Sequence, residues 1–125
     1  MLYAILCYHD EDVVWGWTQE EDKAVMARIG AVTDKLAKAG KLGPSLRLLP
    51  TTSATTLRKG EEPLLIDGPY AETKEQLLGF DVVDVADLDE AVEAARELAA
   101  ANPGGAYEIR PVSVYNADRR PGGTP

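Results

Sequence analysis

The order of strand-like and helix-like segments constrains the fold of this chain more than any other feature. Residues 2–8 alternate as a strand, a helical pattern follows Thr18, several strand-like stretches come next, and a second helical pattern follows Asp87 before a last strand at 107–114. Two helices are too few to cover both faces of a sheet with so many strands. We therefore expect an α+β domain with both helices on one face of an antiparallel sheet, a ferredoxin-like βαββαβ fold with an extra hairpin.

The first helix has clear signals at both ends. Thr18 and Glu21 have the spacing of a capping box, in which the threonine oxygen accepts a backbone N–H and the glutamate reaches back. Gly40 is suited to end the helix. Gly30 lies inside the helix, where glycine costs roughly 1 kcal/mol relative to alanine. We expect a closely packed neighbour at that glycine.

The strand-like segments predict how the sheet is built. Residues 46–49, 54–58 and 64–66 read as short strands of an antiparallel meander, and 77–85 as a longer strand. Residues 2–8 are apolar on both alternating faces, as in a strand that is covered on both sides. Because the helices cover one face only, we expect a homodimer in which a second subunit covers the other.

Composition limits the class of protein. A chain of 125 residues with 45% hydrophobic content is one globular domain. The net charge of −8 disfavours binding to nucleic acid or anionic membrane, and no apolar run approaches the roughly 18 residues of a membrane span. The first residues have no signal-peptide pattern, and Cys7 is the only cysteine. We expect a reduced, cytoplasmic protein.

The segment 67–80 carries the most chemistry. It begins Asp67-Gly68-Pro69-Tyr70 and continues through a polar stretch to the next strand. Asp67 has two readings: a carboxylate that caps the backbone of a turn, or a general base at the mouth of a cleft. His9 ends the first strand beside three acidic residues, either as a proton shuttle or as a solvated loop histidine.

The chain resembles the DGPF group of YCII-related proteins. The residues that carry the resemblance are Asp67-Gly68-Pro69-Tyr70 with Ala71-Glu72-Thr73-Lys74-Glu75, although that group usually has Phe where Tyr70 stands. Further matches are Leu2 to Leu6, Thr55 to Arg58, Leu78-Gly79-Phe80, and Glu108 to Val112. The likeness covers nearly the whole chain, and its central motif is specific.

The resemblance implies a ferredoxin-like domain over residues 1–115 that dimerises sheet to sheet into an α+β barrel. The polar residues 116–125, which include Pro and Gly, are expected to form a flexible tail. The resemblance also implies an active site built around a His/Asp pair, to which Asp67 corresponds. The family histidine lies on the first helix, but residues 26–30 contain none, and His9 is the only histidine in the chain. Relatives in the same superfamily include a lactone dehalogenase, and some DGPF proteins are encoded with sigma-factor-like regulators.

These observations define a set of candidate site residues. We expect Asp67 and His9 to be catalytic and four side chains to bind substrate: Tyr8, Tyr70, Lys74 and Arg110. Lys74 and Arg110 are cations suited to a small anionic molecule, although a solvated charge cluster or a dimer ion pair would explain them equally well. No cofactor is expected, since the chain has no CxxC, no HExxH and no phosphate-binding glycine loop, and one His and one Cys cannot form a zinc site.

Three functions fit this pattern. The first is a small-molecule enzyme of lyase, isomerase or dehalogenase type that uses acid–base chemistry at a cleft near Asp67. The second is a non-catalytic ligand-binding or regulatory accessory protein, associated with a sigma factor. The third is a dimeric module without a small-molecule role.

Overall fold

The computed structural model describes residues 1–116, so the expected tail lies almost entirely outside the described residues. Along the chain the elements are β1 (Leu2–His9), α1 (Glu11–Trp15), α2 (Gln19–Lys38), β2 (Leu42–Arg47), the 3-10 turn η1 (Thr51–Ser53), β3 (Thr55–Arg58), β4 (Leu64–Asp67), β5 (Gln76–Asp84), α3 (Leu88–Ala101) and β6 (Ala106–Pro111).

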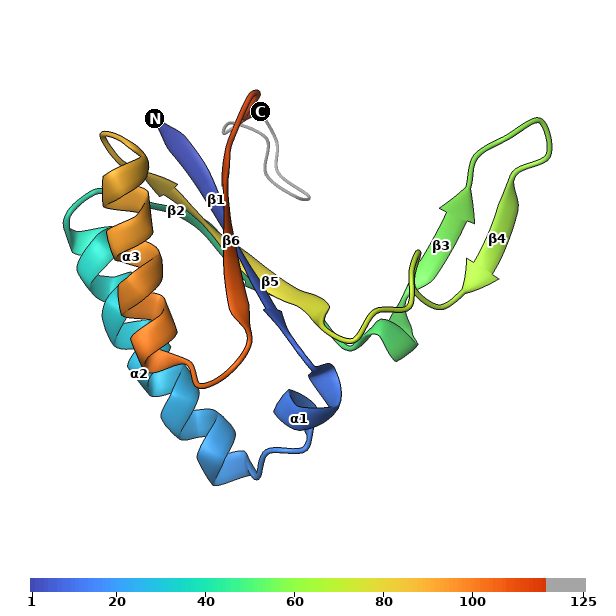
Figure 1. Cartoon of the computed structure of the whole chain (residues 1–125), viewed down its shortest axis with the longest axis horizontal. Helices are drawn as coiled ribbons and strands as arrows, with labels where there is room; N and C mark the ends of the chain where they lie inside the picture. Colours follow the sequence, from blue (N-terminus) through green and yellow to red (C-terminus); the bar gives the residue numbers. More distant parts are fainter. Residues whose placement is uncertain (117–125) are drawn as a thin grey trace, which may run out of the picture.

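A four-stranded antiparallel sheet forms the body of the molecule. Its strand order is β2-β5-β1-β6, so β1 lies between β5 and β6. Figure 1 shows α2 and α3 side by side on one face of this sheet. The predicted ferredoxin-like α+β arrangement, with both long helices on one face, is therefore confirmed.

The core lies between that sheet face and the two helices. Ile5 of β1 and Val83 of β5 are fully buried there, together with Leu98 of α3. Leu36 supplies the corresponding side chain from α2. Because side chains alternate along a strand, residues 3, 5 and 7 of β1 and residues 79, 81 and 83 of β5 face the helices, up to the register shift that follows Cys7.

The opposite sheet face carries the even-numbered series. Leu6 pairs with Phe80 on one side and with Glu108 on the other, and Ala4 lies opposite Val82 and Arg110. Neither α2 nor α3 covers this face.

The helix signals in the sequence are confirmed at the ends of α2. Both hydrogen bonds of the capping box are present between Thr18 and Glu21. Gly40 follows the helix with a positive φ of 72°, which glycine adopts without steric cost. The prediction of close packing at Gly30 is wrong, because a Cβ built there meets no atom within 4 Å.

The predicted meander is wrong in one respect. Residues 42–47 form β2, which pairs with β5 at the edge of the main sheet and not with β3. Gly43-Pro44 hides this strand in the sequence, and proline is tolerated there because an edge strand has one unpaired side. The remaining two predicted strands pair as the β3–β4 hairpin. The short helix α1 was not expected.

The β3–β4 hairpin extends away from the body of the molecule (Figure 1). Its leucines are largely exposed, and Leu57 and Leu65 have relative accessibilities of 59% and 69%. The hairpin therefore contributes nothing to the core between sheet and helices. Among the helices described in residues 1–116, none has both the length and the apolar character needed to cross a membrane.

Candidate functional site

Asp67 lies at the end of β4 and borders a pocket of about 510 Å³. We call it the loop pocket; its walls are formed by Thr51, Thr52, Asp67–Pro69, Ala71–Thr73 and Gln76. The side chain is exposed, and no hydrogen bond from residues 1–116 reaches its carboxylate. The turn is held instead by backbone atoms of Gly68, whose N–H donates to Ala54 O at 2.8 Å and whose carbonyl accepts from Thr56 Oγ1 at 2.8 Å.

His9 does not border the loop pocket, although its strand partner Gln76 does. Its Nδ1 accepts a hydrogen bond from the backbone N–H of Asp10 at 2.7 Å. The ring meets Trp17 edge to face, with 6.4 Å between centroids. It also packs so closely on Gly104 that a Cβ there would lie 2.5 Å from Nε2. The imidazole is thus held by packing, and no hydrogen bond or ion pair within residues 1–116 joins it to Asp67.

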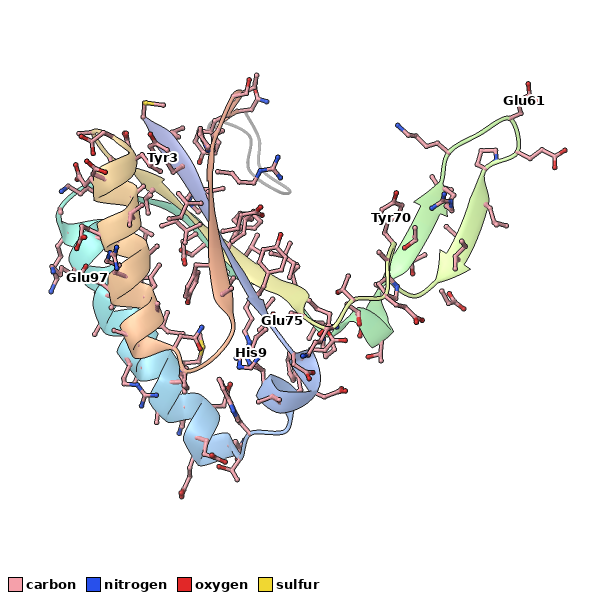
Figure 2. The ribbon with its side chains drawn as sticks, in the orientation of Figure 1. Tyr3, His9, Glu61, Tyr70, Glu75 and Glu97 are labelled. Atoms are coloured by element: carbon pink, nitrogen blue, oxygen red, sulfur yellow. The ribbon has the colours of Figure 1, made fainter. Side chains whose placement is uncertain are left out.

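The four expected substrate-binding residues occupy three separate places. Tyr8 and Arg110 lie on the uncovered sheet face, where the Tyr8 hydroxyl donates to Glu108 at 3.1 Å. Tyr70 lies beside the hairpin, away from His9 (Figure 2), and the Arg58 guanidinium stands 5.5 Å from its ring centroid. Lys74 is exposed in the loop that leads to β5. A single chain does not bring the six predicted residues into one site.

A second cavity lies between α2 and the sheet, with a volume of about 330 Å³. We call it the α2–sheet cavity. The apolar side chains that line it include Val14, Trp17, Met26 and Ile29. Gly30 also borders it, which explains why that glycine has no close neighbour. The volume lies at the lower end of the range for small-molecule pockets.

Asp81 of β5 presents a partly buried carboxylate to this cavity. It lies opposite Ile5 on β1 and Ser45 on β2, on the helix-covered face. The Ser45 hydroxyl donates to its Oδ1 at 2.5 Å. Burial raises the pKa of the Asp81 carboxyl, and the hydrogen bond from Ser45 opposes part of that rise. A carboxyl with a raised pKa beside a cavity has the properties of a general acid–base group.

Three further polar side chains stand beside Asp81. Asn102 Nδ2 donates to the Tyr107 hydroxyl at 3.0 Å and to Cys7 Sγ at 3.6 Å. Burial raises the pKa of the Cys7 thiol and of the Tyr107 phenol. Both groups are therefore neutral near pH 7, because each already ionises above that pH when unperturbed.

Arg47 borders the same cavity at the end of β2. Its guanidinium makes a two-pronged contact with the Asp22 carboxylate, at 3.0 and 3.3 Å. It also lies over the Trp15 ring, 4.9 Å from the centroid. These contacts join α1, α2 and β2 at one place on the cavity rim.

Sequence reasoning missed Asp81, although a signal was present. The inward series of β5 runs Gly79, Asp81, Val83, so a carboxylate interrupts an apolar face. A charged residue in a core-facing register is a functional candidate because burying it without a role is unfavourable. Within residues 1–116, no cluster of three or more His, Cys, Asp or Glu side chains is arranged to hold a metal ion.

An antiparallel sheet with two helices on one face, and a cavity between one helix and that sheet, defines a small α+β protein of the ferredoxin-like class. The YCII-related domain matches residues 1–116, and the chain belongs to this family. It is 54% identical over 123 residues to Uncharacterized protein R00369 of Rhizobium meliloti (strain 1021), an alignment that covers 97% of this chain and 99% of the relative.

Proposed function

We propose that this protein acts on a small organic molecule by proton transfer, as an enzyme of lyase, isomerase or dehalogenase type. One observation carries the proposal: Asp81 is a partly buried carboxylate, oriented by Ser45, on the wall of an apolar cavity large enough for a small ligand. Removal of a proton from carbon begins the reactions meant here, namely isomerisation through an enolate and elimination, including the elimination of hydrogen halide. A carboxylate whose pKa is raised is a stronger base for that step than an ordinary surface carboxylate.

Asp67 remains a second candidate for the same chemistry. The observation in its favour is that its carboxylate borders the loop pocket and accepts no hydrogen bond within residues 1–116, so it is free to contact a ligand. Lys74 lies in the same loop and supplies a cation for an anionic substrate group. The Asp67 carboxylate is exposed and no hydrogen bond within residues 1–116 orients it, so Asp81 is the better-positioned base of the two.

A non-catalytic ligand-binding or regulatory accessory role, such as partnership with a sigma factor, is the alternative. The position of His9 favours it, because the imidazole packs against Trp17 and Gly104 and borders neither the loop pocket nor the α2–sheet cavity. Without an imidazole partner, proton transfer would depend on a single carboxyl.

Deuterium exchange tests the proposal while the substrate is still unidentified. The wild-type protein is incubated in D₂O with a pooled library of small carbon acids, and mass spectrometry detects exchange at carbon. We expect wild-type exchange of at least one compound and a fall of roughly 10²-fold or more in Asp81→Asn. Asp67→Asn is the matched variant: loss of exchange there alone moves the site to the loop pocket. Binding of a library compound without exchange by the wild type supports the accessory role.

We further propose that the protein is a homodimer joined through the uncovered sheet face. The apolar residues Ala4, Leu6 and Phe80 lie on that face, and neither long helix covers it. In such a dimer Tyr8 and Arg110 would lie at or near the interface, and they would meet a ligand only if it bound between the subunits.

A further inference from the structure

The charge balance of the α2–sheet cavity restricts what it can bind. Among its lining residues, Asp81 is the one anionic side chain and Arg47 the one cationic side chain. Arg47 is already engaged by the Asp22 carboxylate and the Trp15 ring. The Asp81 carboxylate has a hydrogen bond from Ser45 but no cationic partner within residues 1–116.

The other polar groups of the cavity do not balance this charge. Cys7 and Tyr107 are neutral at physiological pH and share the amide donor of Asn102. The Thr33 hydroxyl donates to the carbonyl of Gly30 in its own helix, at 3.1 Å. An anionic ligand would therefore stand near Asp81 with no free cation to receive it, and such an arrangement is unfavourable in a partly desolvated site.

A ligand that carries a positive charge reverses this balance. Its ammonium group would donate to Asp81 and provide the missing counter-charge, in a charge-assisted hydrogen bond that is about twice as strong as a neutral one. The aromatic rings of Trp17 and Tyr107, which border the cavity, are suited to the apolar body and to the cation itself. The overall net charge of −8 also attracts cations to the protein.

We infer that the α2–sheet cavity binds an organic monocation, a primary or secondary amine with a compact apolar or aromatic body, whose ammonium group pairs with Asp81. A volume of about 330 Å³ suits one substituted ring, since a cavity of roughly 150 Å³ is enough for benzene. This inference depends on the proposed function in one respect only: both take the α2–sheet cavity as the ligand site.

Three probes of nearly equal shape separate charge from shape: benzylamine, benzyl alcohol and benzoate. Their affinities for the full-length protein are measured by calorimetry or by NMR titration near neutral pH. We expect benzylamine to bind at least about tenfold more tightly than benzyl alcohol, because only the amine forms an ion pair, and benzoate to bind most weakly. Equal or tighter binding of the alcohol or of benzoate, or no binding of any probe, overturns the inference.

Two variants locate the binding. Asp81→Asn keeps the side-chain size but removes the charge, so it should remove the preference for amine over alcohol while the alcohol still binds. Gly30→Leu places a side chain in the cavity and should weaken all bound probes, whereas Ala31→Leu, on an exposed part of the same helix, should not. If Ala31→Leu weakens binding as much as Gly30→Leu, the probe is not in the cavity and the inference is wrong.

The pH dependence adds an independent check. Amine binding should weaken as the pH falls through the pKa of Asp81, since the neutral carboxyl cannot pair with an ammonium group. The groups that face Asp81 are Cys7 of β1, Tyr107 of β6 and Arg47 of β2, and α2 presents only Met26, Ile29, Gly30 and Thr33 to the cavity. His9 also contacts Trp17 of the cavity, and Asp22 pairs with Arg47 at the rim, so the part of the pH dependence that Asp81→Asn removes is the part that reports on Asp81.

The two proposals fail in different ways. If benzyl alcohol binds more tightly than benzylamine, and binding depends on Gly30, the cavity remains the ligand site and only the ligand class is wrong. If amine binding depends on Asp81 but no library compound exchanges deuterium, the ligand class stands and the catalytic role does not.

Discussion

The hydroxyl of Ser45 donates a hydrogen bond to the carboxylate of Asp81 across the β2–β5 pair, with 2.5 Å between the two oxygens. This contact fixes the orientation of the acid on the cavity wall. Burial and the serine have opposite effects on it: burial raises the pKa of Asp81 and the hydrogen bond lowers it. Ser45 is thus a positioning residue. The charge state of Asp81 depends both on its burial and on the hydrogen bond from Ser45.

Asp81→Asn should stabilise the protein at neutral pH. The pKa of Asp81 in the folded protein lies above its ordinary value of 3.8, so the native state binds the proton more tightly than the unfolded chain. The stability gained from the neutral carboxyl is fully present below pH 3.8 and is lost as pH rises through the folded pKa. The neutral asparagine avoids that loss. Urea unfolding of both proteins should show a difference at about pH 7 that disappears below about pH 4.

Asp84→Asn is the control for this measurement. Asp84 belongs to the same strand but its side chain is exposed on the other face, where it meets the N-terminal ammonium at 3.3 Å. Removing that surface contact should change stability by less than about 1 kcal/mol. An equal gain in the two variants would show that the effect is a general one of net charge and not of burial at Asp81.

Gly30→Ala should stabilise the protein by roughly 1 kcal/mol, because alanine is the better helix former and the added methyl group meets no atom within 4 Å. Gly40→Ala also meets no close atom, but its φ of +72° is strained for alanine. It should therefore destabilise by a similar amount. Thermal or urea unfolding of both variants measures the contrast. Destabilisation by Gly30→Ala would mean that, in the wild-type protein in solution, the sheet packs directly on α2 at Gly30 and leaves no cavity there.

The general fold was accessible from sequence because its signals are local. The capping box at Thr18, the double-sided apolar pattern of residues 2–8 and the cap at Asp87 each depend on neighbouring residues. The pairing of β2 was not accessible, because it depends on which edge of the sheet residues 42–47 reach. A local pattern states that a strand exists but does not state its partner.

The candidate site was likewise predictable from the sequence only in part. The sequence marks Asp67 through a turn motif, and the structure shows that a pocket does lie beside it. The sequence cannot show that His9 packs on Gly104, since that contact joins residues far apart in the chain. Asp81 was within reach, because its place in the inward series of β5 follows from alternation alone.

Arg47→Lys should loosen the rim of the α2–sheet cavity with little loss of stability. Lysine keeps the charge but cannot make the two-pronged contact with Asp22 or stack on Trp15 in the same way. The ion pair is partly exposed, so the loss of stability should stay below about 1 kcal/mol. Acrylamide should quench tryptophan fluorescence more strongly in the variant, because Trp15 loses its cover.

Arg58→Lys is the matched control for that experiment, since Arg58 stacks on Tyr70 beside the hairpin and not on a tryptophan. Its quenching should equal that of the wild type. If Arg47→Lys quenches no more than Arg58→Lys, the guanidinium does not shield the rim in solution.

Asp67→Asn should leave folding almost unchanged, within roughly 1 kcal/mol, because the carboxylate caps no backbone group in residues 1–116 and Gly68 holds the turn through its own backbone. If the loop pocket is the catalytic site, deuterium exchange should fall by roughly 10²-fold or more in this variant. Unfolding curves and exchange rates are compared on the same preparations. A large drop in melting temperature would instead assign Asp67 a structural role.

A homodimer through the uncovered sheet face should separate when a charge is placed on that face. Leu6→Glu puts a second carboxylate next to Glu108 on the neighbouring strand, and burying both at an interface is unfavourable. Leu88→Glu is the control, because Leu88 is 51% exposed in the first turn of α3, where an acidic side chain suits the helix dipole. Light scattering at micromolar protein should give a dimer mass for the wild type and for Leu88→Glu, and a monomer mass for Leu6→Glu with an unchanged circular dichroism spectrum. A monomeric wild type would contradict the proposed dimer. A Leu6→Glu variant that stays dimeric would show that the interface lies on another surface. The exposed leucines of the β3–β4 hairpin would then be the next surface to test.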